Sequence, residues 1–212
     1  MSTTSTLRMV TATLALTGLG AVAFAACGST RTTGADPVRS GPVASSSAMA
    51  EQALGTIARL AAERVMTADT VAAAKWGTDQ PIDDPAREKT VLGNAAARAA
   101  ELGIGQATVQ RIFKDQIDAN KDVQRALFAQ WRADPAARPT HRPDLATQVR
   151  PVLDRVDGRL LTAIKEAEPL LSRPGCDALL ERGKVTTVRA MGLDAVHRSG
   201  LDQALAHTCP AG

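Results

Sequence analysis

Residues 106–133 read QATVQRIFKDQIDANKDVQRALFAQWRA, a long run without proline or glycine. At the helical period of 100° per residue, its bulky apolar side chains fall in one sector of about 100°; they are Phe113, Ile117, Leu127, Phe128 and Trp131. Asp134-Pro135 ends the pattern, because proline lacks the amide hydrogen that a helix interior needs. The stretch therefore predicts one long amphipathic helix with a buried face.

The same helical pattern recurs on both sides of this stretch, between segments rich in Pro, Gly and Asp. Glycines at 103 and 105 mark a turn before it, and a proline-rich loop over 136–143 follows it. We predict further helices at about Met49–Trp76, Pro85–Leu102, Asp144–Leu171, Cys176–Met191 and Leu193–His207. Residues 48–212 are therefore expected to fold as one all-α domain of about six helices.

The composition of the chain agrees with this fold class. Hydrophobic residues make up 44% of its 212 residues but aromatic residues only 2%, and tyrosine is absent. The core is therefore expected to be aliphatic, and abundant alanine favours packed helices over strands. With so few rings, a formal net charge of only +3 and no long Lys/Arg run, we expect no nucleic-acid partner.

The first 26 residues form a segment of their own. Arg8 is its one charged residue, and the apolar run from Met9 to Ala26 ends in small residues. This pattern is typical of a secretory signal peptide, so we expect a periplasmic or secreted protein. An uncleaved membrane anchor is the alternative, although the run is short and interrupted by Thr and Gly. Residues 27–47, rich in Ser, Thr, Gly and Pro, are expected to be a flexible tether.

The three cysteines divide into one near the signal segment and two near the end of the chain. Phe24-Ala25-Ala26-Cys27 resembles a bacterial lipobox, in which the cysteine is acylated, so Cys27 is a candidate lipid anchor. Phe24 departs from the usual aliphatic residue, and cleavage without lipidation is the alternative. Cys176 and Cys209 bracket the last two predicted helices, and in an exported chain we expect them to form a structural disulfide.

Four polar side chains project from predicted apolar faces. Asn120 and Gln124 lie in the apolar sector of the long helix, and burying an unpartnered amide costs roughly 1 to 3 kcal/mol. Arg64 and Lys75 lie on the apolar face of the first helix, about 16 Å apart if that helix is unbroken. Each pair alone has a simpler explanation. The two amides would be hydrogen-bonded to each other, and the two cations would reach back to the surface. Together the four residues indicate a polar pocket.

The residue types of this pocket suit a small anion. Asp84, Arg87 and Glu88 in the next segment add charged groups to the two cations and two amides. We find no nucleophile and base at a catalytic spacing, and the three histidines lack the spacing of metal ligands; they are His141, His197 and His207. We therefore expect no metal, and a reaction that depends on positioning and electrostatics.

From Leu60 to Cys209 the chain resembles the helical chorismate mutases, and within them the secreted bacterial subclass. The stretches that carry the resemblance are Ala61-Ala62-Glu63-Arg64, Val71-Ala72-Ala73-Ala74-Lys75-Trp76, Pro81-Ile82-Asp83-Asp84-Pro85-Ala86-Arg87-Glu88, and Phe113-Lys114-Asp115-Gln116-Ile117-Asp118-Ala119-Asn120 with Gln124. Their order and spacing both match the family. The proline-rich loop, Asp144-Leu145 and the Cys176/Cys209 pair are similar to the secreted subclass.

The resemblance implies a rearrangement of chorismate to prephenate that needs no cofactor and no covalent intermediate. By the same resemblance, Arg64 and Arg150 bind the two substrate carboxylates, and Lys75 and Gln124 donate hydrogen bonds to the ether oxygen. Arg87, with Glu88 and the backbone near Asp84, holds the ring hydroxyl and a carboxylate. Asn120 stands where the family has a small hydroxyl residue. Arg150 is the least secure of these positions, because Arg155 and Arg159 follow closely.

Two points stay open at the level of sequence. A non-catalytic helical lipoprotein that binds an acidic metabolite or a partner helix in the same pocket is the alternative function. Members of the family are often homodimers, whereas the secreted type builds its site within one chain, so the oligomeric state is not given by these residues.

Overall fold

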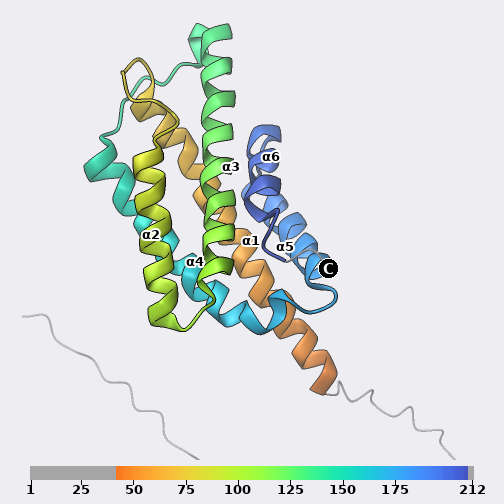
Figure 1. Ribbon diagram of the computed structural model, residues 1–212. Helices are drawn as coiled ribbons and strands as arrows, with labels where there is room; N and C mark the ends of the chain where they lie inside the picture. Colours follow the sequence, from red (N-terminus) through yellow and green to blue (C-terminus); the bar gives the residue numbers. More distant parts are fainter. Residues whose placement is uncertain (1–41, 210–212) are drawn as a thin grey trace, which may run out of the picture. The chain divides into compact units, whose positions relative to one another are not determined.

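The computed structural model describes residues 42–209, which are helical throughout apart from the connecting segments (Figure 1). The α-helices are α1 (Pro42–Lys75), α2 (Pro85–Leu102), α3 (Gln106–Ala133), α4 (Arg150–Leu171), α5 (Cys176–Met191) and α6 (Ala195–Leu205). A short 3-10 turn, η1 (Pro135–Ala137), and a π-helical turn, η2 (Leu145–Val149), lie between α3 and α4. No strand occurs within this range. The predicted all-α class with six helices is therefore confirmed.

The helix α1 lies at the centre of the domain. It packs against α3, α4, α5 and α6, while α2 packs against α3 and α4 (Figure 1). Its side chains Leu54, Ile57 and Ala61 are fully buried, as the predicted apolar face requires. The core that they enter is aliphatic apart from Phe113 and the cysteines 176 and 209. Burial of this face on several sides explains why so long a helix is stable.

Two glycines allow the helices to pack closely against one another. A Cβ atom on Gly183 of α5 would lie 2.8 Å from the Cα atom of Gly55 on α1. A Cβ atom on Gly200 of α6 would lie 2.6 Å from Cγ2 of Val123 on α3. These distances are shorter than real contacts, so both crossings depend on the missing side chain.

The observed helix ends differ from the predicted ones at three places. The helix α1 begins at Pro42 rather than near Met49, so residues 42–47 are helical although we assigned them to the tether. Proline is favoured at the first helical position, where its missing N–H is not needed. The turn η2 occupies the start of the helix predicted from Asp144, whose side chain accepts a hydrogen bond from the Thr147 amide at 2.7 Å. The last helix is α6, two residues shorter at each end than predicted.

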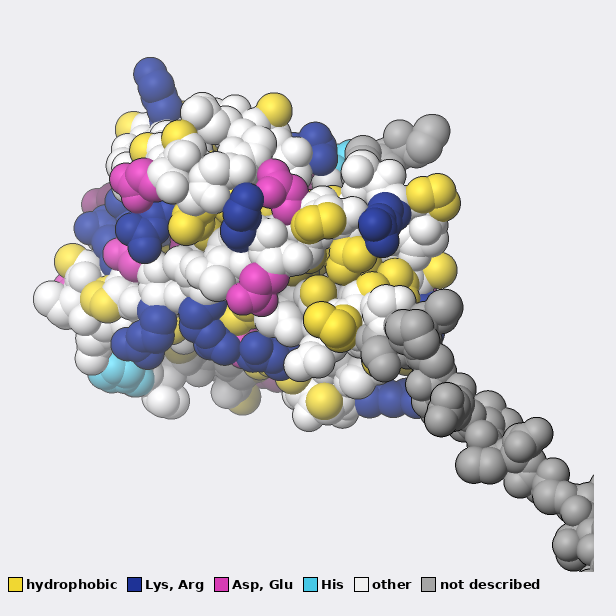
Figure 2. Space-filling view, turned by 90° about the horizontal axis from the view of Figure 1, so that it is seen from below, with side chains coloured by type: hydrophobic (Ala, Val, Ile, Leu, Met, Phe, Trp, Pro, Cys, Tyr) yellow, Lys and Arg dark blue, Asp and Glu magenta, His cyan; other side chains and the backbone are white. Residues whose placement is uncertain are grey.

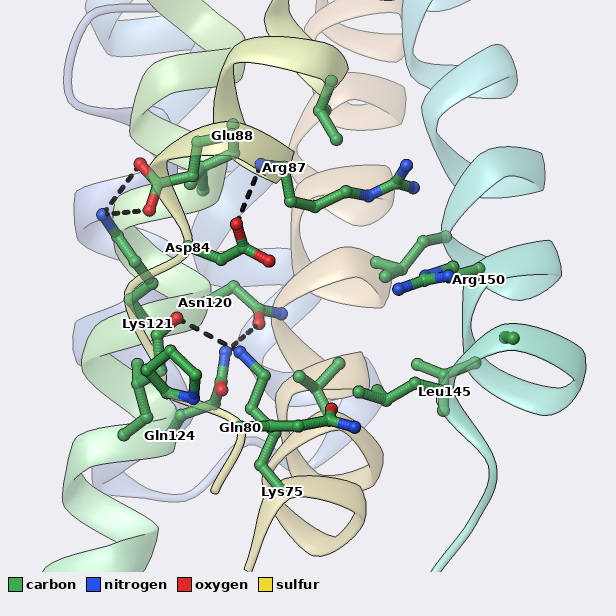
Figure 3. A pocket seen from close by; sticks show the side chains of 18 of the residues that line it. Lys75, Gln80, Asp84, Arg87, Glu88, Asn120, Lys121, Gln124, Leu145 and Arg150 are labelled. Atoms are coloured by element: carbon green, nitrogen blue, oxygen red, sulfur yellow. Dashed lines mark hydrogen bonds and ion pairs between the residues drawn. The ribbon is translucent and has the colours of Figure 1, made fainter. Parts of the chain in front are cut away.

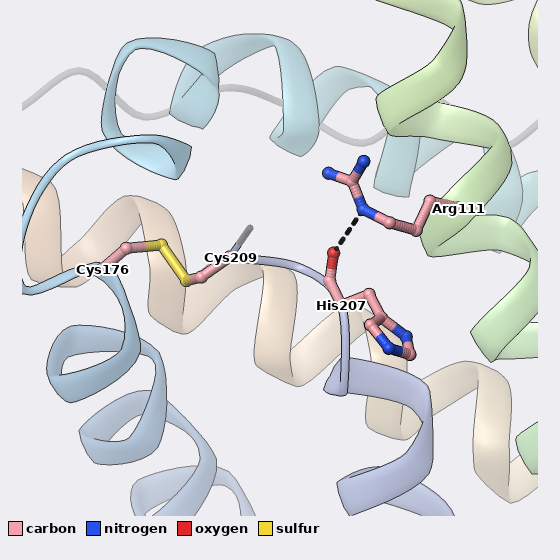
Figure 4. The surroundings of a disulfide bond; sticks show 4 residues. All are labelled: Arg111, Cys176, His207 and Cys209. Atoms are coloured by element: carbon pink, nitrogen blue, oxygen red, sulfur yellow. Dashed lines mark hydrogen bonds between the residues drawn. A yellow bond between two sulfur atoms is a disulfide. The ribbon is translucent and has the colours of Figure 1, made fainter. Parts of the chain in front are cut away.

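The predicted disulfide between Cys176 and Cys209 is present, with a Cα–Cα distance of 5.9 Å (Figure 4). It joins the start of α5 to the segment after α6. The same segment is held by Arg111 of α3, whose Nε donates to the carbonyl of His207 at 3.0 Å. The side chain of Asp115 accepts from the backbone amide of His207, also at 3.0 Å. The C-terminal segment is thus attached to both α5 and α3.

The surface of the domain carries mixed charge. The face in Figure 2 shows acidic and basic side chains next to one another, with apolar side chains between them. No helix within residues 42–209 combines the length and the apolar character that a membrane span requires. The predicted signal peptide (1–26), most of the predicted tether and the candidate lipidation site Cys27 lie outside the described residues.

Candidate active site

A cavity of about 400 Å³ lies among α1, α2, α3 and the η2–α4 segment (Figure 3). Its wall contains every residue that the sequence predicted for the site: Arg64, Lys75, Asp84, Arg87, Glu88, Asn120, Gln124 and Arg150. These residues come from four separate helices and the segment before α2. The fold therefore brings them to one place, and the next question is which of their polar groups are already occupied.

Arg64 lies on the inner face of α1 and is only 4% exposed. Its Nε donates to Asp157 Oδ1 of α4 at 2.6 Å, and its Nη1 donates to the backbone carbonyl of Gln116 at 2.8 Å. The side chain therefore does not reach back to the surface. A buried guanidinium needs such partners because an unpaired buried charge is costly.

Lys75 is the last residue of α1, and the helix is continuous between it and Arg64. Its Nζ donates to the backbone carbonyl of Ile82 at 3.1 Å. Burial lowers the pKa of Lys75, and the negative charges of Asp84, Asp83 and Glu88 only partly offset this effect. Within residues 42–209 it makes no ion pair, so its ammonium group is available to a ligand.

The start of α2 brings a carboxylate and a guanidinium to the cavity. Asp84 caps the helix by accepting the amide hydrogen of Arg87 at 3.0 Å, and Pro85 occupies the first helical position. This cap explains why α2 starts where it does. The Arg87 guanidinium then projects from the first turn toward the cavity, as Figure 3 shows.

Glu88, one turn into α2, is held by Lys121 of α3. The Lys121 Nζ lies 3.1 Å from both carboxylate oxygens of Glu88. It also lies 3.1 Å from Asp118 and 3.5 Å from Asp83. Burial opposes the charge of Lys121, but its hydrogen bonds to Glu88 and Asp118 outweigh that effect and raise its pKa. Lys121 therefore ties the start of α2 to α3.

The two amides of α3 form a hydrogen-bonded chain. Asn120 Nδ2 donates to the carbonyl of Arg64 and to Thr67 Oγ1, both at 3.2 Å. Gln124 Nε2 donates to Asn120 Oδ1 at 2.8 Å. Asn120 and Gln124 are 7% and 3% exposed, as their place in the apolar sector predicted. The two amides are therefore hydrogen-bonded to each other, as the simpler explanation predicted. Both residues also line the cavity.

The fourth wall of the cavity is formed by η2 and the start of α4. The turn η2 places Leu145 and Val149 against the cavity, and Arg150 follows directly with its guanidinium directed inward (Figure 3). Arg155 and Arg159 do not line the cavity, and Arg159 instead pairs with Glu63 at 2.7 Å. Of the three arginines near this point, the fold selects Arg150.

Sequence reasoning missed two residues that hold the site together, Asp157 and Lys121. Asp157 lies three residues before the fully buried Leu160, on the inner stripe of α4. The rule that singled out Arg64 on α1 would therefore have found its partner as well. Lys121 lies beside the apolar sector of α3 rather than in it, and no periodic signal marks it.

Five basic and five acidic side chains line the cavity, and more of the acidic than of the basic ones are engaged within the protein. Asp157 pairs with Arg64, Glu88 with Lys121, and Asp84 and Asp144 cap helical turns. Asp154 makes no ion pair within residues 42–209. Among the described residues, three cations of the wall have no carboxylate partner: Lys75, Arg87 and Arg150. They come from α1, α2 and α4, so a small polyanion in the cavity would meet positive charge from three sides.

The cavity offers hydrogen-bond donors and fixed positive charge rather than a nucleophile or a metal site. Within residues 42–209, no three His, Cys, Asp or Glu side chains gather in a way that could hold a metal ion. Such a site can bind an anion, fix its conformation and stabilise negative charge that develops on it.

Comparison with known proteins identifies relatives of this fold and site. The family model described as chorismate mutase type II matches residues 55–125. The secreted chorismate mutase of Mycolicibacterium smegmatis is 37% identical over 149 residues, which cover 70% of this chain and 82% of that protein. The secreted chorismate mutase of Mycobacterium tuberculosis is 35% identical over 158 residues, 74% of this chain and 79% of that protein. The crystal structure of chorismate mutase from Burkholderia phymatum superposes with a TM-score of 0.72 at 37% identity, over 76% of this chain and 99% of that chain.

Proposed function

The chain belongs to the type II chorismate mutase family, and we propose that the cavity described above is where it rearranges chorismate to prephenate. The reaction breaks one C–O bond and forms one C–C bond within a single molecule. No group is transferred and no cofactor takes part. The protein therefore has to select a reactive conformer and stabilise the charge of the transition state.

The observation that carries this proposal is the convergence of Lys75, Arg87 and Arg150 on one cavity without carboxylate partners. Chorismate carries two carboxylates, so it matches a site that has spare positive charge on three sides. Arg64 adds a fourth cation at the deep end of the cavity. Because Nε is occupied and Nη1 has used one of its two N–H groups, Nη2 is the nitrogen of Arg64 with both N–H groups left for a substrate carboxylate.

The two carboxylates would lie at opposite ends of the cavity. Arg64, which is almost fully buried, would hold one of them, and Arg150, which is exposed at the mouth, would hold the other. Arg87 and Glu88, with the backbone near Asp84, would hold the ring hydroxyl and a carboxylate. Clamping both ends selects the folded conformer in which the reacting carbon atoms approach one another.

The ether oxygen becomes more negative as its bond to carbon breaks. Lys75 and Gln124 would donate hydrogen bonds to it, and both would bind the transition state more tightly than the substrate. Removing one such preorganised donor typically costs about 10²- to 10³-fold in rate. Because the donors are already fixed by α1 and α3, little reorganisation is needed during the reaction.

The decisive experiment is to incubate the purified chain with chorismate and to separate substrate and product by chromatography. We expect prephenate to appear in step with the loss of chorismate. A matched reaction with the Lys75→Ala variant controls for the uncatalysed rearrangement. Binding of chorismate without turnover would instead support the alternative of a non-catalytic binding protein.

The relatives named as secreted support export of this chain as well. We propose that residues 1–26 are removed as a signal peptide and that Cys27 is acylated, as its lipobox-like context suggests. Mass spectrometry of the protein isolated from membranes tests this, because a mature chain that begins after Ala26 without lipid would contradict the anchor.

A homodimer is the further proposal that the family resemblance supports. The eight residues predicted for the site already line one cavity of a single chain, so their arrangement does not by itself require the dimer. Light scattering at the concentration of the activity assay tests the state, and a monomeric mass for the active protein would contradict the dimer.

A further inference from the structure

Asn120 lies in the cavity wall next to Gln124, and its hydrogen bonds limit what it can do there. A primary amide has two N–H donors and one carbonyl oxygen. Its Nδ2 donates to the carbonyl of Arg64 and to Thr67 Oγ1, both at 3.2 Å, and because these two acceptors lie 2.6 Å apart they share one N–H. Its oxygen accepts from Gln124 Nε2 at 2.8 Å. The contacts of Asn120 therefore connect α1 to Gln124.

The direction of each amide in this chain follows from its neighbour. The backbone carbonyl of Arg64 can only accept a hydrogen bond, so the Asn120 atom that faces it is the amide nitrogen. The other end of Asn120 is therefore its oxygen, and the Gln124 atom that faces this oxygen is a nitrogen. A single backbone carbonyl of α1 thus fixes the orientation of both side chains.

From these hydrogen bonds we infer that Asn120 is a positioning residue. It holds the Gln124 amide with its nitrogen turned to the ether oxygen of the substrate. One N–H of Gln124 Nε2 is bound by Asn120, and the second is free to donate. Without Asn120, rotation of the amide by half a turn would direct the Gln124 carbonyl oxygen at the same place. An oxygen there repels the charge that develops in the transition state.

Thr67 completes the arrangement from α1. Its Oγ1 donates to the carbonyl of Arg64 at 2.6 Å and accepts from Asn120 at 3.2 Å. The hydroxyl group is therefore fixed by the backbone and in turn fixes Asn120. Thr67 does not line the cavity, so it acts on the reaction only through Asn120 and Gln124.

This inference rests on the proposed function, and kinetic constants for chorismate test it. The Asn120→Ala variant is expected to lower kcat by roughly tenfold and to leave KM within about twofold, because a donor used in the transition state is misdirected. Loss of a direct carboxylate contact would instead raise KM. An increase in KM with unchanged kcat, or no change in either constant, would overturn the inference.

The Thr67→Val variant removes only the hydroxyl and is expected to lower kcat by a few-fold with KM unchanged. A wild-type kcat in this variant would show that Thr67 does not help to position Gln124.

His197 provides the control for stability. It lies on α6, is 5% exposed, and its ring nitrogens lie 2.8 Å from Asp194 Oδ1 and 3.0 Å from Asp69 Oδ1, outside the cavity. His197→Ala therefore removes a buried, hydrogen-bonded side chain without changing a residue of the cavity wall. We expect it to lower the melting temperature and to leave kcat unchanged. An equal fall in kcat for both variants would assign the effect of Asn120 to stability alone.

A measurement without substrate keeps this inference separate from the proposed function. In the ¹⁵N-labelled chain, one of the two side-chain N–H signals of Gln124 should show slow hydrogen exchange, because it is bound to Asn120. Asn120→Ala should abolish that protection, and His197→Ala should not. A chain that fails to convert chorismate but shows this pattern would refute the activity while keeping the amide orientation. Rapid exchange of both signals in the unmodified chain would refute the orientation itself.

Discussion

Removing the cross-link between Cys176 and Cys209 should lower stability strongly and leave activity at 25 °C unchanged. The two residues are 33 positions apart. In the chain-entropy model, a closed loop of that length stabilises the folded state by roughly 3.5 to 4 kcal/mol at 25 °C. The perturbation is the double variant Cys176→Ala/Cys209→Ala, which avoids an unpaired buried thiol.

The expected shift in melting temperature follows from the size of the ordered domain. About 170 ordered residues, with an unfolding entropy of about 2.1 cal/mol/K per residue, give roughly 0.35 kcal/mol/K. A loss of 3.5 to 4 kcal/mol then lowers the melting temperature by about 10 °C. Activity should persist, because every residue of the cavity wall precedes α5 and the farthest along the chain is Asp157.

Thermal denaturation followed by circular dichroism, with and without a reducing agent, measures this effect. The wild-type chain should fall to the melting temperature of the double variant on reduction, and the double variant should not respond. A shift below about 2 °C would refute the entropic reasoning. A double variant that is folded at 25 °C but inactive would show that α5 and α6 contribute to the site, against the geometry of the cavity.

The further predictions concern the site and the packing of the helices. Lys75→Ala should retain the fold and lower kcat by about 10²-fold or more, and a kcat within a few-fold of wild type would remove Lys75 from the reaction. Burial lowers the pKa of Lys75, so the rate should be level from about pH 5 to 8 and fall, as the ammonium loses its proton, at a lower pH than an exposed lysine would give. In the same pH–rate profile, Gln124→Glu should favour acid, because only a protonated carboxyl can donate, and a level profile for this variant would contradict the role of Gln124. Gly183→Ala should destabilise the domain by about 1 to 3 kcal/mol, since its Cβ would lie 2.8 Å from the backbone of α1. Gly93→Ala, at an exposed helical position with open space around it, should have the opposite sign in the same denaturation experiment.

Periodicity in the sequence predicted which site residues share one face of a helix. Residues eleven positions apart on one helix face the same side, so Arg64 and Lys75 could be placed together before any tertiary contact was known. The burial of Asn120 and Gln124 followed from the same rule. The partners of these residues did not follow, because Asp157 lies 93 positions from Arg64 and Thr67 lies 53 positions from Asn120. Such contacts depend on how the helices cross, which no local pattern contains.

The start of the helix before Arg150 shows a second limit of sequence reasoning. Asp144 correctly marks a helical start, but the first turn is η2, a π-helical turn. A π-turn holds one more residue per hydrogen-bonded ring than an α-turn, and helical periodicity does not predict it. Arg150 is the first residue of α4 and exposed, so it lines the cavity at its edge although it flanks the apolar stripe of its helix.

The charge count of the cavity wall shows why neither global nor local composition could identify an anion site. Basic and acidic side chains are equally numerous in the wall, and the formal charge of the chain is only +3. The acids, however, are largely occupied by Arg64, by Lys121 and by helical amides, while three cations have no acidic partner among the described residues. A substrate interacts with the polar groups that form no hydrogen bond or ion pair within the protein. Removal of Asp157 would therefore act by releasing Arg64 from its fixed position more than by adding net charge, because the orientation of that guanidinium depends on the hydrogen bond between them.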